Sequence, residues 1–534
     1  MMLPFLHSPK FLLLLLAIVL FAPRSCLALT EAQINASRPF IVSIKTRTTA
    51  SAYSGEGSIS GTGSIIDKKN GIILTNAHVI GPDRVVPYYE ITLHNGREVR
   101  AYLLYMDPWH DFAFLKVRDE DIEKLPAEVT IDNREIKIGE PVYMIGKNEN
   151  RPFSPQKGIV SDTYGTIGIL PSQVFRISQN AQGGASGSPV FSKDDKVIGL
   201  VNASDGGTFS FALPIAYAMD ALKSVKENKI APRFATGIIL DYKSLDDLVR
   251  FYNFPKDLAE QYRTKFPTAS NQILVVKNIL AATPGEELFE VGDVITHING
   301  TEIGPNYYLL DKIVNEASAS KPDGSVEFTV IRRGKTLNLK VKTYDLNQRK
   351  IQKMVQFGGA VFYEADDAIV QRTGARDHRV FVTNIRPGSS FAEKLPLIPR
   401  SNFTLVSIIR IGEKEITCLQ DVIDLIPTLV EKNDFFVFYK NYGVEFGIDS
   451  LPFFAQTLQT QQITYSRHDG LPEVYTFDHN SGVWAVETIG TPATLAPKKI
   501  PLVAVTQPAT SSEAETKNQS LIARIRGYLT SLGL

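Results

Sequence analysis

The sequence predicts a multidomain, mainly β protein, and three observations support this prediction. The chain has 534 residues, which is too many for a single hydrophobic core. From Arg38 to about Lys226, short apolar segments alternate with turns rich in Gly, Asn and Asp, as expected for an all-β domain. Further on, a succession of strand, turn, strand, helix and strand occurs twice, about a hundred residues apart, which indicates two related modules.

Composition narrows the class of protein. The chain carries 57 basic and 57 acidic residues, so no excess of positive charge points to a nucleic-acid partner. Aromatic residues make up 10% of the chain and charged residues 21%, which is typical of globular rather than disordered proteins.

The N-terminus predicts a cleaved signal peptide over residues 1–28, and therefore export to the periplasm or secretion. A basic residue precedes the apolar run Phe11–Ala22, which is too short to span a bilayer comfortably and is followed by small residues. An uncleaved membrane anchor is the alternative. Cleavage would remove Cys26 and leave Cys418 as the only thiol, so no internal disulfide is expected. We expect no other membrane-spanning segment.

The first predicted domain covers residues 29–228. The tight turn at Asn95-Gly96 predicts a β-hairpin. The stretch 214–228 changes to helical spacing and closes the domain, with one apolar face made of Ile215, Met219, Leu222 and Val225. Its predicted strands lie in the segments RPFIVSIKT, GTGSIID, GIILTN, EITLHNG, REVRAYLLYMD, DFAFLKV, EPVYMIG and KVIGLVNA.

The internal repeat predicts two modules, at 229–346 and 347–452. Its two copies run from Ile273 to Ile303 and from Val380 to Ile416, with tight turns at Asn299-Gly300 and Gly412-Glu413. The second copy is the more divergent. A β-hairpin around residues 480–482 is expected within 453–490, and 491–534 reads as a flexible linker followed by a short amphipathic helix.

The stretch NAQGGASGSPVF, residues 180–191, has the small residues that a serine nucleophile needs around it. Glycines allow the chain to turn so that successive backbone N–H groups point at one oxyanion. The N–H groups of Gly184 and Ser186 are the expected donors. Ser188 is the competing serine, but Pro189 restrains it to an extended conformation, so Ser186 is the predicted nucleophile.

A base and an orienting carboxylate are also present. His78 ends a buried-looking strand in the segment ILTNAHVI, and Asp111 opens the alternating strand DFAFLKV. A carboxylate at the mouth of such a strand costs stability unless it has a partner. The order His78, Asp111, Ser186 is that of chymotrypsin-type enzymes. Taken singly, each residue has an ordinary structural interpretation, as a turn histidine, a strand cap or a glycine-rich turn.

With these motifs, the chain resembles the trypsin-like serine proteases, specifically the HtrA/Deg group. The resemblance rests on GTGSIID, GIILTNAHVI, ITLHNGREVRAYLLYMDPWHDFAFLKV, IGEPVYMIG, KGIVSD, GGASGSPVF, KVIGLVNA and FALPI, in the family's order over most of residues 38–226. It implies two six-stranded β-barrels with the active site between them, followed by two PDZ-like α/β modules. It implies His78, Asp111 and Ser186 as the catalytic triad and Gly184, Ala185 and Ser186 as the oxyanion hole.

The chain departs from the family pattern at two positions. Ala185 stands where the family usually has Asn, and Ser188 where it usually has a second glycine. The Ser-Gly-Ser-Pro run is similar to that of glutamyl endopeptidases, but GGTFSFALP lacks the histidine that such a pocket would need. The resemblance therefore implies a pocket for small or medium apolar side chains. Its predicted lining is Val201, Asn202, Ala203 and Phe211.

The resemblance also explains the repeat, because HtrA-like proteases carry PDZ modules after the protease domain. The segment FATGIIL is similar to the family's carboxylate-binding segment, so Ala235, Thr236, Gly237 and Ile238 are predicted to bind C-terminal peptides. The second module matches the PDZ pattern only loosely. It is therefore expected to be a spacer or an assembly surface rather than a peptide-binding module. The family's usual assembly implies a homo-oligomer, a trimer or a multiple of one.

The implied activity is hydrolysis of unfolded or damaged proteins through an acyl-enzyme, without metal or cofactor and without nucleic acid. The rate is expected to fall below about pH 6 to 7, as the imidazole of His78 is protonated. A non-proteolytic chaperone or adaptor with a degenerate protease domain is the alternative from another class. The C-terminal helix is expected either to be a solvated tail or to dock into a PDZ groove as an inhibitor.

Overall fold

The computed structural model describes residues 29–489, apart from the internal segments 49, 52–56, 82–83, 87, 149–150, 168–169, 321–323, 374, 384–385, 387, 393, 396–402, 445–457 and 479–482. The predicted signal peptide, linker and C-terminal helix therefore lie outside the described residues. None of the helices described has both the length and the apolar character needed to cross a membrane.

The first domain contains two closed barrels of six strands each, as predicted. In the first barrel the strand order is β1-β3-β4-β8-β7-β6. The predicted hairpin joins β6 to β7, and Gly96 adopts a φ of +79° in its turn. These strands are β1 (Ile41–Thr48), β3 (Gly57–Asp67), β4 (Ile72–Thr75), β6 (Tyr89–Leu93), β7 (Glu98–Met106) and β8 (Ala113–Val117). Outside the barrel lie α2 (Glu31–Ser37), α3 (Ala77–Ile80) and the strand pair β2 (Ala50–Ser51) and β5 (Arg84–Val85).

The second barrel has the order β10-β11-β14-β13-β12-β9 and is followed by α4 (Ile215–Lys226). Ile215, Leu222 and Val225 of the predicted apolar face are buried, and Met219 is partly buried against the same core. This helix packs on β13 and β14 and closes the domain, as expected. The strands are β9 (Pro141–Asn148), β10 (Arg151–Ile167), β11 (Leu170–Ile177), β12 (Pro189–Ser192), β13 (Val197–Ser204) and β14 (Ser210–Pro214).

The first module is an antiparallel sheet with the order β16-β17-β18-β20-β21, covered by helices. Asn299-Gly300 forms the tight turn between β18 and β19, as predicted. The strands are β15 (Phe234–Ala235), β16 (Ile238–Ser244), β17 (Gln272–Ile279), β18 (Val294–Ile298), β19 (Thr301–Glu302), β20 (Ser325–Arg332), β21 (Lys335–Lys342) and β22 (Tyr344–Asp345). The helices are α5 (Leu245–Phe251), α6 (Lys256–Lys265) and α7 (Tyr307–Ser320).

The second module contains a larger sheet, with the path β29-β28-β26-β25-β24-β23-β30-β31. Gly412 forms the predicted turn between β26 and β27. The strands are β23 (Lys353–Phe357), β24 (Ala360–Glu364), β25 (Val380–Thr383), β26 (Phe403–Ile411), β27 (Lys414–Glu415), β28 (Asp434–Val444), β29 (Gln459–Thr464), β30 (Glu473–Asp478) and β31 (Val483–Thr488). The helices are α8 (Asp367–Thr373) and α9 (Leu419–Lys432).

The two modules share one strand order, which supports the internal repeat. The series β16, β17, β18, β20 and β21 corresponds to β24, β25, β26, β28 and β29, and α7 corresponds to α9. The modules differ at one edge. The strand β16 ends its sheet, whereas β24 is paired with β23, and β30 and β31 extend the sheet beyond β23. The expected C-terminal hairpin is thus an integral part of the second sheet rather than an appendage.

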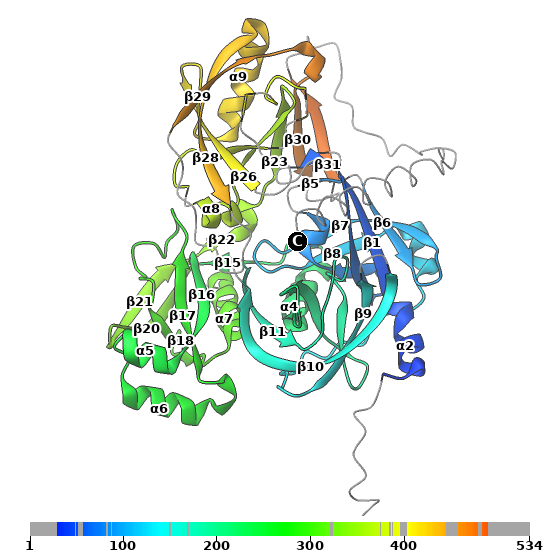
Figure 1. The fold of residues 1–534 in the computed structure, drawn as a ribbon, viewed down its shortest axis with the longest axis vertical. Coiled ribbons are helices and arrows are strands. Elements are labelled where there is room, and N and C mark those ends of the chain that lie inside the picture. The colour runs from blue at the N-terminus through cyan, green and yellow to red at the C-terminus, as the bar shows by residue number, and fades with distance from the viewer. Residues whose placement is uncertain are drawn as a thin grey trace, which may run out of the picture.

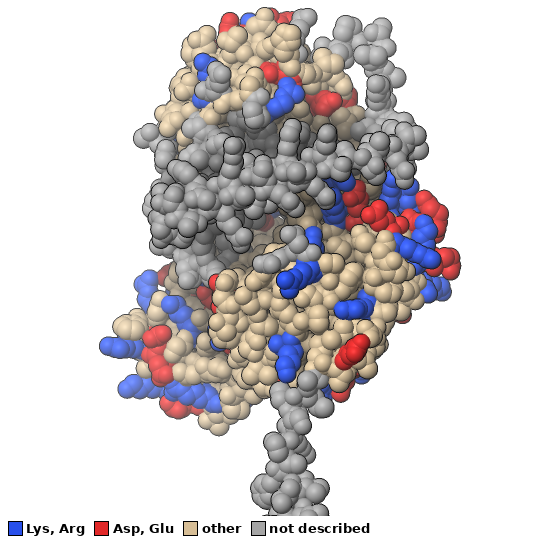
Figure 2. Space-filling model, turned by 45° about the vertical axis from the view of Figure 1, so that its right-hand side comes forward, with Lys and Arg blue, Asp and Glu red and all other residues tan. Residues whose placement is uncertain are grey.

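Both modules pack against the first domain. In Figure 1 the second module lies above the barrels and the first module beside them. Helix α7 contacts β11 of the second barrel, and β16 contacts β10. Val85, a few residues after α3, is buried in an apolar cluster made mostly of second-module residues. Figure 2 shows charged side chains of both signs scattered over the face in view, in keeping with the balanced charge of the chain.

Candidate active site

His78 and Asp111 are in direct contact in the structure. His78 lies on the short helix α3, and its backbone N–H donates to Oδ1 of Asp111 at 3.0 Å. The Nδ1 of the same histidine lies 2.8 Å from Oδ2 of Asp111. The aspartate is therefore bound twice by one residue, which fixes both the rotation of the imidazole and the position of the carboxylate.

The two side chains differ in burial in the way that an acid–base pair needs. The Asp111 side chain is 5% exposed, whereas that of His78 is 47% exposed. The backbone carbonyl of Asp111 also accepts a hydrogen bond from Nδ2 of Asn76 at 2.8 Å, which ties the Asp111 loop to the start of α3. The imidazole thus has a buried carboxylate on one side and solvent on the other.

Ser186 lies in the turn between β11 and β12 and is partly exposed. Its carbonyl oxygen accepts the N–H of Thr62 at 2.8 Å, so the serine turn of the second barrel is attached to β3 of the first. Thr62 also donates its hydroxyl to the carbonyl of Gly184 at 2.9 Å. Two backbone carbonyls of the serine turn are therefore held by one residue of the other barrel.

Gly61 of β3 lies next to both the helix that carries His78 and the turn that carries Ser186. A Cβ at Gly61 would lie 2.6 Å from the methyl groups of Val79 and 3.2 Å from the carbonyl oxygen of Ser186. Only a residue without a side chain allows α3 and the serine turn to approach the same point of β3. The GTG motif at residues 61–63 thus brings the His78 helix and the Ser186 turn to one strand.

The three residues of the predicted oxyanion hole differ in whether their backbone N–H groups are available. Gly184 adopts a φ of +94°, and within the described part of the chain neither its N–H nor that of Ser186 has an acceptor. The N–H of Ala185 donates to the carbonyl of Gln182 at 3.0 Å, so this residue is engaged within the turn. Ala185 therefore belongs to the turn without offering a donor, and the N–H groups of Gly184 and Ser186 stay the expected donors.

Ser188 is fully buried, and a Cβ at Gly146 would lie 1.8 Å from its hydroxyl oxygen. This burial leaves Ser186 as the accessible serine of the run, in agreement with the sequence-based choice.

The four predicted pocket residues have different environments. Val201 belongs to the apolar core of the second barrel and is 1% exposed, so its side chain does not line an open pocket. Asn202 is also buried, and neither amide atom has a partner among the described residues. Ala203 and Phe211 are partly exposed and pair across β13 and β14. A register shift between Val201 and Ala203 separates the buried residues from the accessible ones.

The predicted peptide-binding residues of the first module are all buried. Gly237 has a φ of +94°, and a Cβ there would lie 1.9 Å from the Thr283 hydroxyl. Ala235 pairs with Tyr344, while the carbonyls of Thr236 and Gly237 accept backbone N–H groups at 2.8 and 2.7 Å. The following strand, β16, contacts β10 of the protease. The loop around Ala235, Thr236, Gly237 and Ile238 is thus closed in this structure.

Sequence reasoning missed a buried ion pair beside the Asp111 loop. Arg233, from the segment that joins the protease to the first module, donates Nε to Oδ2 of Asp107 at 2.8 Å, and its Nη2 lies 2.5 Å from the same oxygen. The side chains are 7% and 0% exposed. The other oxygen of Asp107 accepts the N–H groups of Trp109 and His110 at 2.9 and 2.7 Å. Arg233 therefore holds the turn that leads to Asp111.

His110, the neighbour of Asp111, is buried between the protease and the first module. Its Nδ1 lies 2.7 Å from the hydroxyl of Ser172, and its ring centroid lies 4.2 Å from that of Tyr217. Burial lowers the pKa of His110 to about 3, and the charge of Arg233 acts in the same direction. This imidazole is therefore neutral at physiological pH.

Comparison with protein families gives two matches. The trypsin-like peptidase domain family matches residues 61–200, and the PDZ domain family matches residues 258–343. The first match spans the segments that carry His78, Asp111 and Ser186. The second covers most of the sheet and the helix α7 of the first module.

Curated relatives include proteins named "Pro-apoptotic serine protease NMA111" from fungi. The protein of Saccharomyces cerevisiae strain S288c is 26% identical over 443 residues, which cover 81% of this chain and 42% of the relative. That of Lodderomyces elongisporus is 27% identical over 311 residues, which cover 56% of this chain and 31% of the relative. The chain thus spans well under half the length of these relatives.

Among solved structures, an HtrA-type protease AlgW with a tripeptide is 22% identical, with a TM-score of 0.43, over 59% of this chain and 97% of that one. A serine endoprotease from Yersinia pestis is 21% identical, with a TM-score of 0.40, over 60% of this chain and 99% of that one. The domain matches and the curated relatives agree with the barrels and the module described above. The chain contains a trypsin-like peptidase domain followed by a PDZ domain, as the sequence predicts, and is similar over 81% of its length to a curated serine protease.

Proposed function

We propose that this chain is an active HtrA-type serine endopeptidase that cleaves unfolded or damaged proteins through an acyl-enzyme. The observation that supports it most directly is the doubly bonded pair of His78 and Asp111, anchored to the same strand as the accessible Ser186. All three positions of a triad are filled, and the N–H groups of Gly184 and Ser186 are uncommitted among the described residues.

In the proposed reaction, Oγ of Ser186 attacks the carbonyl carbon of the scissile peptide bond while the imidazole of His78 accepts its proton. The buried carboxylate of Asp111 stabilises the imidazolium that forms. The N–H groups of Gly184 and Ser186 donate to the oxyanion, which needs donors that are already in position. The imidazolium then protonates the leaving amine, and water hydrolyses the acyl-enzyme by the reverse sequence of proton transfers.

Peptide binding at the first module and assembly into homo-oligomers are parts of the same proposal. A PDZ module accepts an extended chain along a sheet edge, and β16 is the edge strand of this sheet. Because the loop that precedes β16 is buried, we expect peptide binding to require movement of the module away from β10 and β11. The second module is proposed to be a spacer or an assembly surface, since β23 fills the corresponding edge of β24.

The decisive experiment compares the chain with its Ser186→Ala variant in casein cleavage and in labelling by a fluorophosphonate probe. We expect both activities to fall by at least about 10³-fold in the variant. The adaptor alternative predicts no labelling of the unchanged chain under any condition, including added C-terminal peptide. Labelling that persists in Ser186→Ala would also contradict the proposed nucleophile.

Export is proposed on the basis of the apolar run at residues 11–22 alone. N-terminal sequencing of the mature protein from its native source is expected to begin at Leu29. A mature chain that retains residue 1 would favour the membrane anchor.

A further inference from the structure

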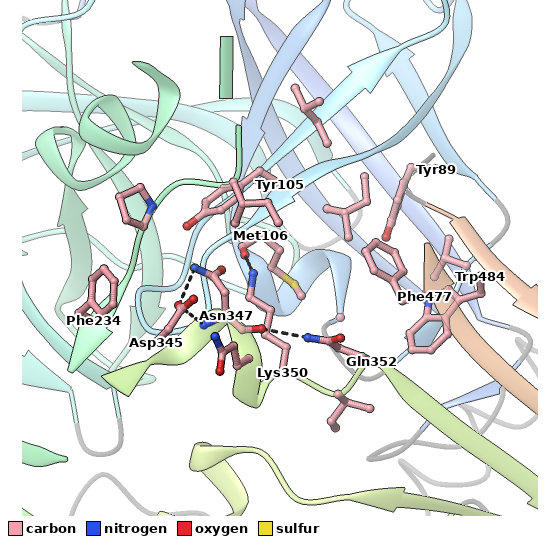
Figure 3. Close-up of a pocket in the computed structure, with 18 residues that line it drawn as sticks. Tyr89, Tyr105, Met106, Phe234, Asp345, Asn347, Lys350, Gln352, Phe477 and Trp484 are labelled. Carbon is pink, nitrogen blue, oxygen red and sulfur yellow. Dashed lines mark hydrogen bonds between the residues drawn. The ribbon is translucent and has the colours of Figure 1, made fainter. Parts of the chain in front are cut away.

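A cavity of about 470 Å³ lies where the first barrel meets the C-terminal hairpin and two connecting segments (Figure 3). These segments, around 230–234 and 345–352, join the first module to the domain before it and to the module after it. The volume of the cavity falls within the range of about 300–1,000 Å³ that small-molecule sites occupy. It is distinct from the candidate active site, since neither His78, Asp111 nor Ser186 lines it. Its walls include Val86, Tyr89, Leu103, Met106, Ile230 and Trp484.

One side of this cavity is apolar. On this side Tyr89 of the barrel lies near Phe477 and Trp484 of the hairpin, as Figure 3 shows. Phe477 and Trp484 are partly exposed, and Ile230 keeps 55% of its surface exposed. Apolar side chains of the hairpin and of the segment around Ile230 thus remain accessible within one concave space, where a hydrocarbon group would remove them from water.

The other side of the cavity holds Lys350, on which the carboxylates of Asp107 and Asp345 act at longer range. The Nζ of Lys350 donates to the carbonyl of Met106 at 2.5 Å, which uses one of its three N–H groups. No described carboxylate lies within ion-pair distance of this ammonium. The nearby Asp345 caps a helical turn, accepting the N–H and the Nδ2 of Asn347 at 2.9 and 3.2 Å. Burial lowers the pKa of Lys350 to about 8, so an anion beside it would relieve an unfavourable environment.

We propose that this cavity binds a fatty-acid-like monocarboxylate, with the carboxylate on Lys350 and the hydrocarbon chain against Tyr89, Phe477 and Trp484. A peptide fits the lining less well, because its backbone N–H and C=O groups would be buried opposite aliphatic and aromatic side chains. A hydrocarbon chain has no polar groups to satisfy. One charged contact at one end and an apolar wall at the other match an amphipathic anion.

The position of the cavity links it to the segments that hold the proposed catalytic pair. Gly81, which ends α3, and Met106, which precedes Asp107, both belong to its wall. The ligand would therefore contact the first barrel, the connecting segments and the hairpin at once. Because it binds the assembled chain and not the unfolded one, it should raise the temperature of unfolding in proportion to its concentration.

The test uses the full chain with Trp109→Phe, which leaves Trp484 as the only tryptophan and as a reporter inside the cavity. Decanoate and decanol are titrated below their aggregation limits, with tryptophan fluorescence and calorimetry as readouts. Saturable decanoate binding, at least about tenfold tighter than that of decanol, is expected from one charge-assisted hydrogen bond. This comparison needs no change at Lys350.

A pair of lysine variants then tests whether the ammonium of Lys350 binds the carboxylate of decanoate. In Lys350→Met, decanoate affinity is expected to fall to that of decanol, while Lys353→Met, a lysine outside the cavity wall, should bind decanoate unchanged. The proposal is overturned by equal affinities for decanoate and decanol, by no saturable binding of decanoate, or by an unchanged decanoate affinity in Lys350→Met. Tighter binding of an acetylated tripeptide ending in Leu would overturn it in favour of a peptide site. All readouts are independent of proteolysis.

Discussion

Replacing Arg233 by Met is expected to damage both the stability of the chain and the proposed active site. The substitution removes the charge that pairs with Asp107 and leaves this carboxylate in a site where it is 0% exposed. Burial alone would raise the pKa of Asp107, but Arg233 and nearby N–H groups hold it below its ordinary value. Without Arg233, Asp107 must either remain charged and unpaired or take up a proton.

Removing one partner of a buried ion pair typically costs about 3–5 kcal/mol, and the burial of this pair places it in that class. Arg233→Lys keeps the charge but loses the two-nitrogen contact, so it should cost roughly 1–2 kcal/mol. Urea unfolding of the full chain measures both effects. Because Asp107 also accepts the N–H groups of Trp109 and His110, kcat should fall in Arg233→Met even where the chain is fully folded.

A double-mutant cycle with Asp107→Asn separates this pairing from unrelated damage. If the two residues act through each other, the double variant loses clearly less stability than the sum of the single variants. Additive losses, or a loss below about 1 kcal/mol in Arg233→Met, would refute the reasoning from the buried pair. A loss of stability with an unchanged kcat at saturating substrate would instead limit Arg233 to a structural role.

Three further outcomes follow from the structure. His110 is neutral when folded, with a pKa of about 3 against an ordinary 6.5, so unfolding takes up a proton between these values. Stability should therefore fall as pH decreases from about 6.5, by up to about 1.4 kcal/mol per pH unit more than in His110→Asn, and matched urea titrations at several pH values would test this. Gly187→Ala should destabilise the serine turn by more than about 1 kcal/mol and reduce fluorophosphonate labelling, because φ is +85° and a Cβ would lie 2.0 Å from a β3 carbonyl oxygen. Gly183→Ala, with open space around its Cβ, is the matched control, and equal behaviour of the two variants would contradict the argument. Ser188→Ala should keep full labelling, since the hydroxyl that it removes is buried and has no described partner, whereas Ser186→Ala abolishes it.

The sequence predicted the elements whose formation depends on local pattern. Alternating apolar residues and turn glycines located the barrel strands, and the Asn95-Gly96 turn and the apolar face of α4 appear where they were expected. The repeat was recognisable because both modules keep a tight turn after the third strand, between β18 and β19 in one and between β26 and β27 in the other. His78, Asp111 and Ser186 could be chosen because small residues and strand ends mark such positions without any knowledge of their distant partners.

The errors arose where tertiary contacts decide the environment. Val201 reads as a pocket residue from its position, but the register shift in β13 leaves its side chain in the barrel core. The pairing of Arg233 with Asp107 joins positions 126 residues apart, and no local pattern marks it. The burial of Thr236 and its neighbours depends on packing within the first module and against the protease, which the motif alone does not specify.

Val85 has a practical consequence for anyone who wishes to shorten this protein. A fragment ending at α4 would retain every residue of the proposed triad, yet it would remove the other members of the apolar cluster that buries Val85, among them Tyr363 and Ile369. The segment that follows α3, the helix of His78, would then lose its apolar packing against the second module. An inactive fragment of this kind would say little about the intact enzyme, and dissection should begin at the far end of the second sheet instead.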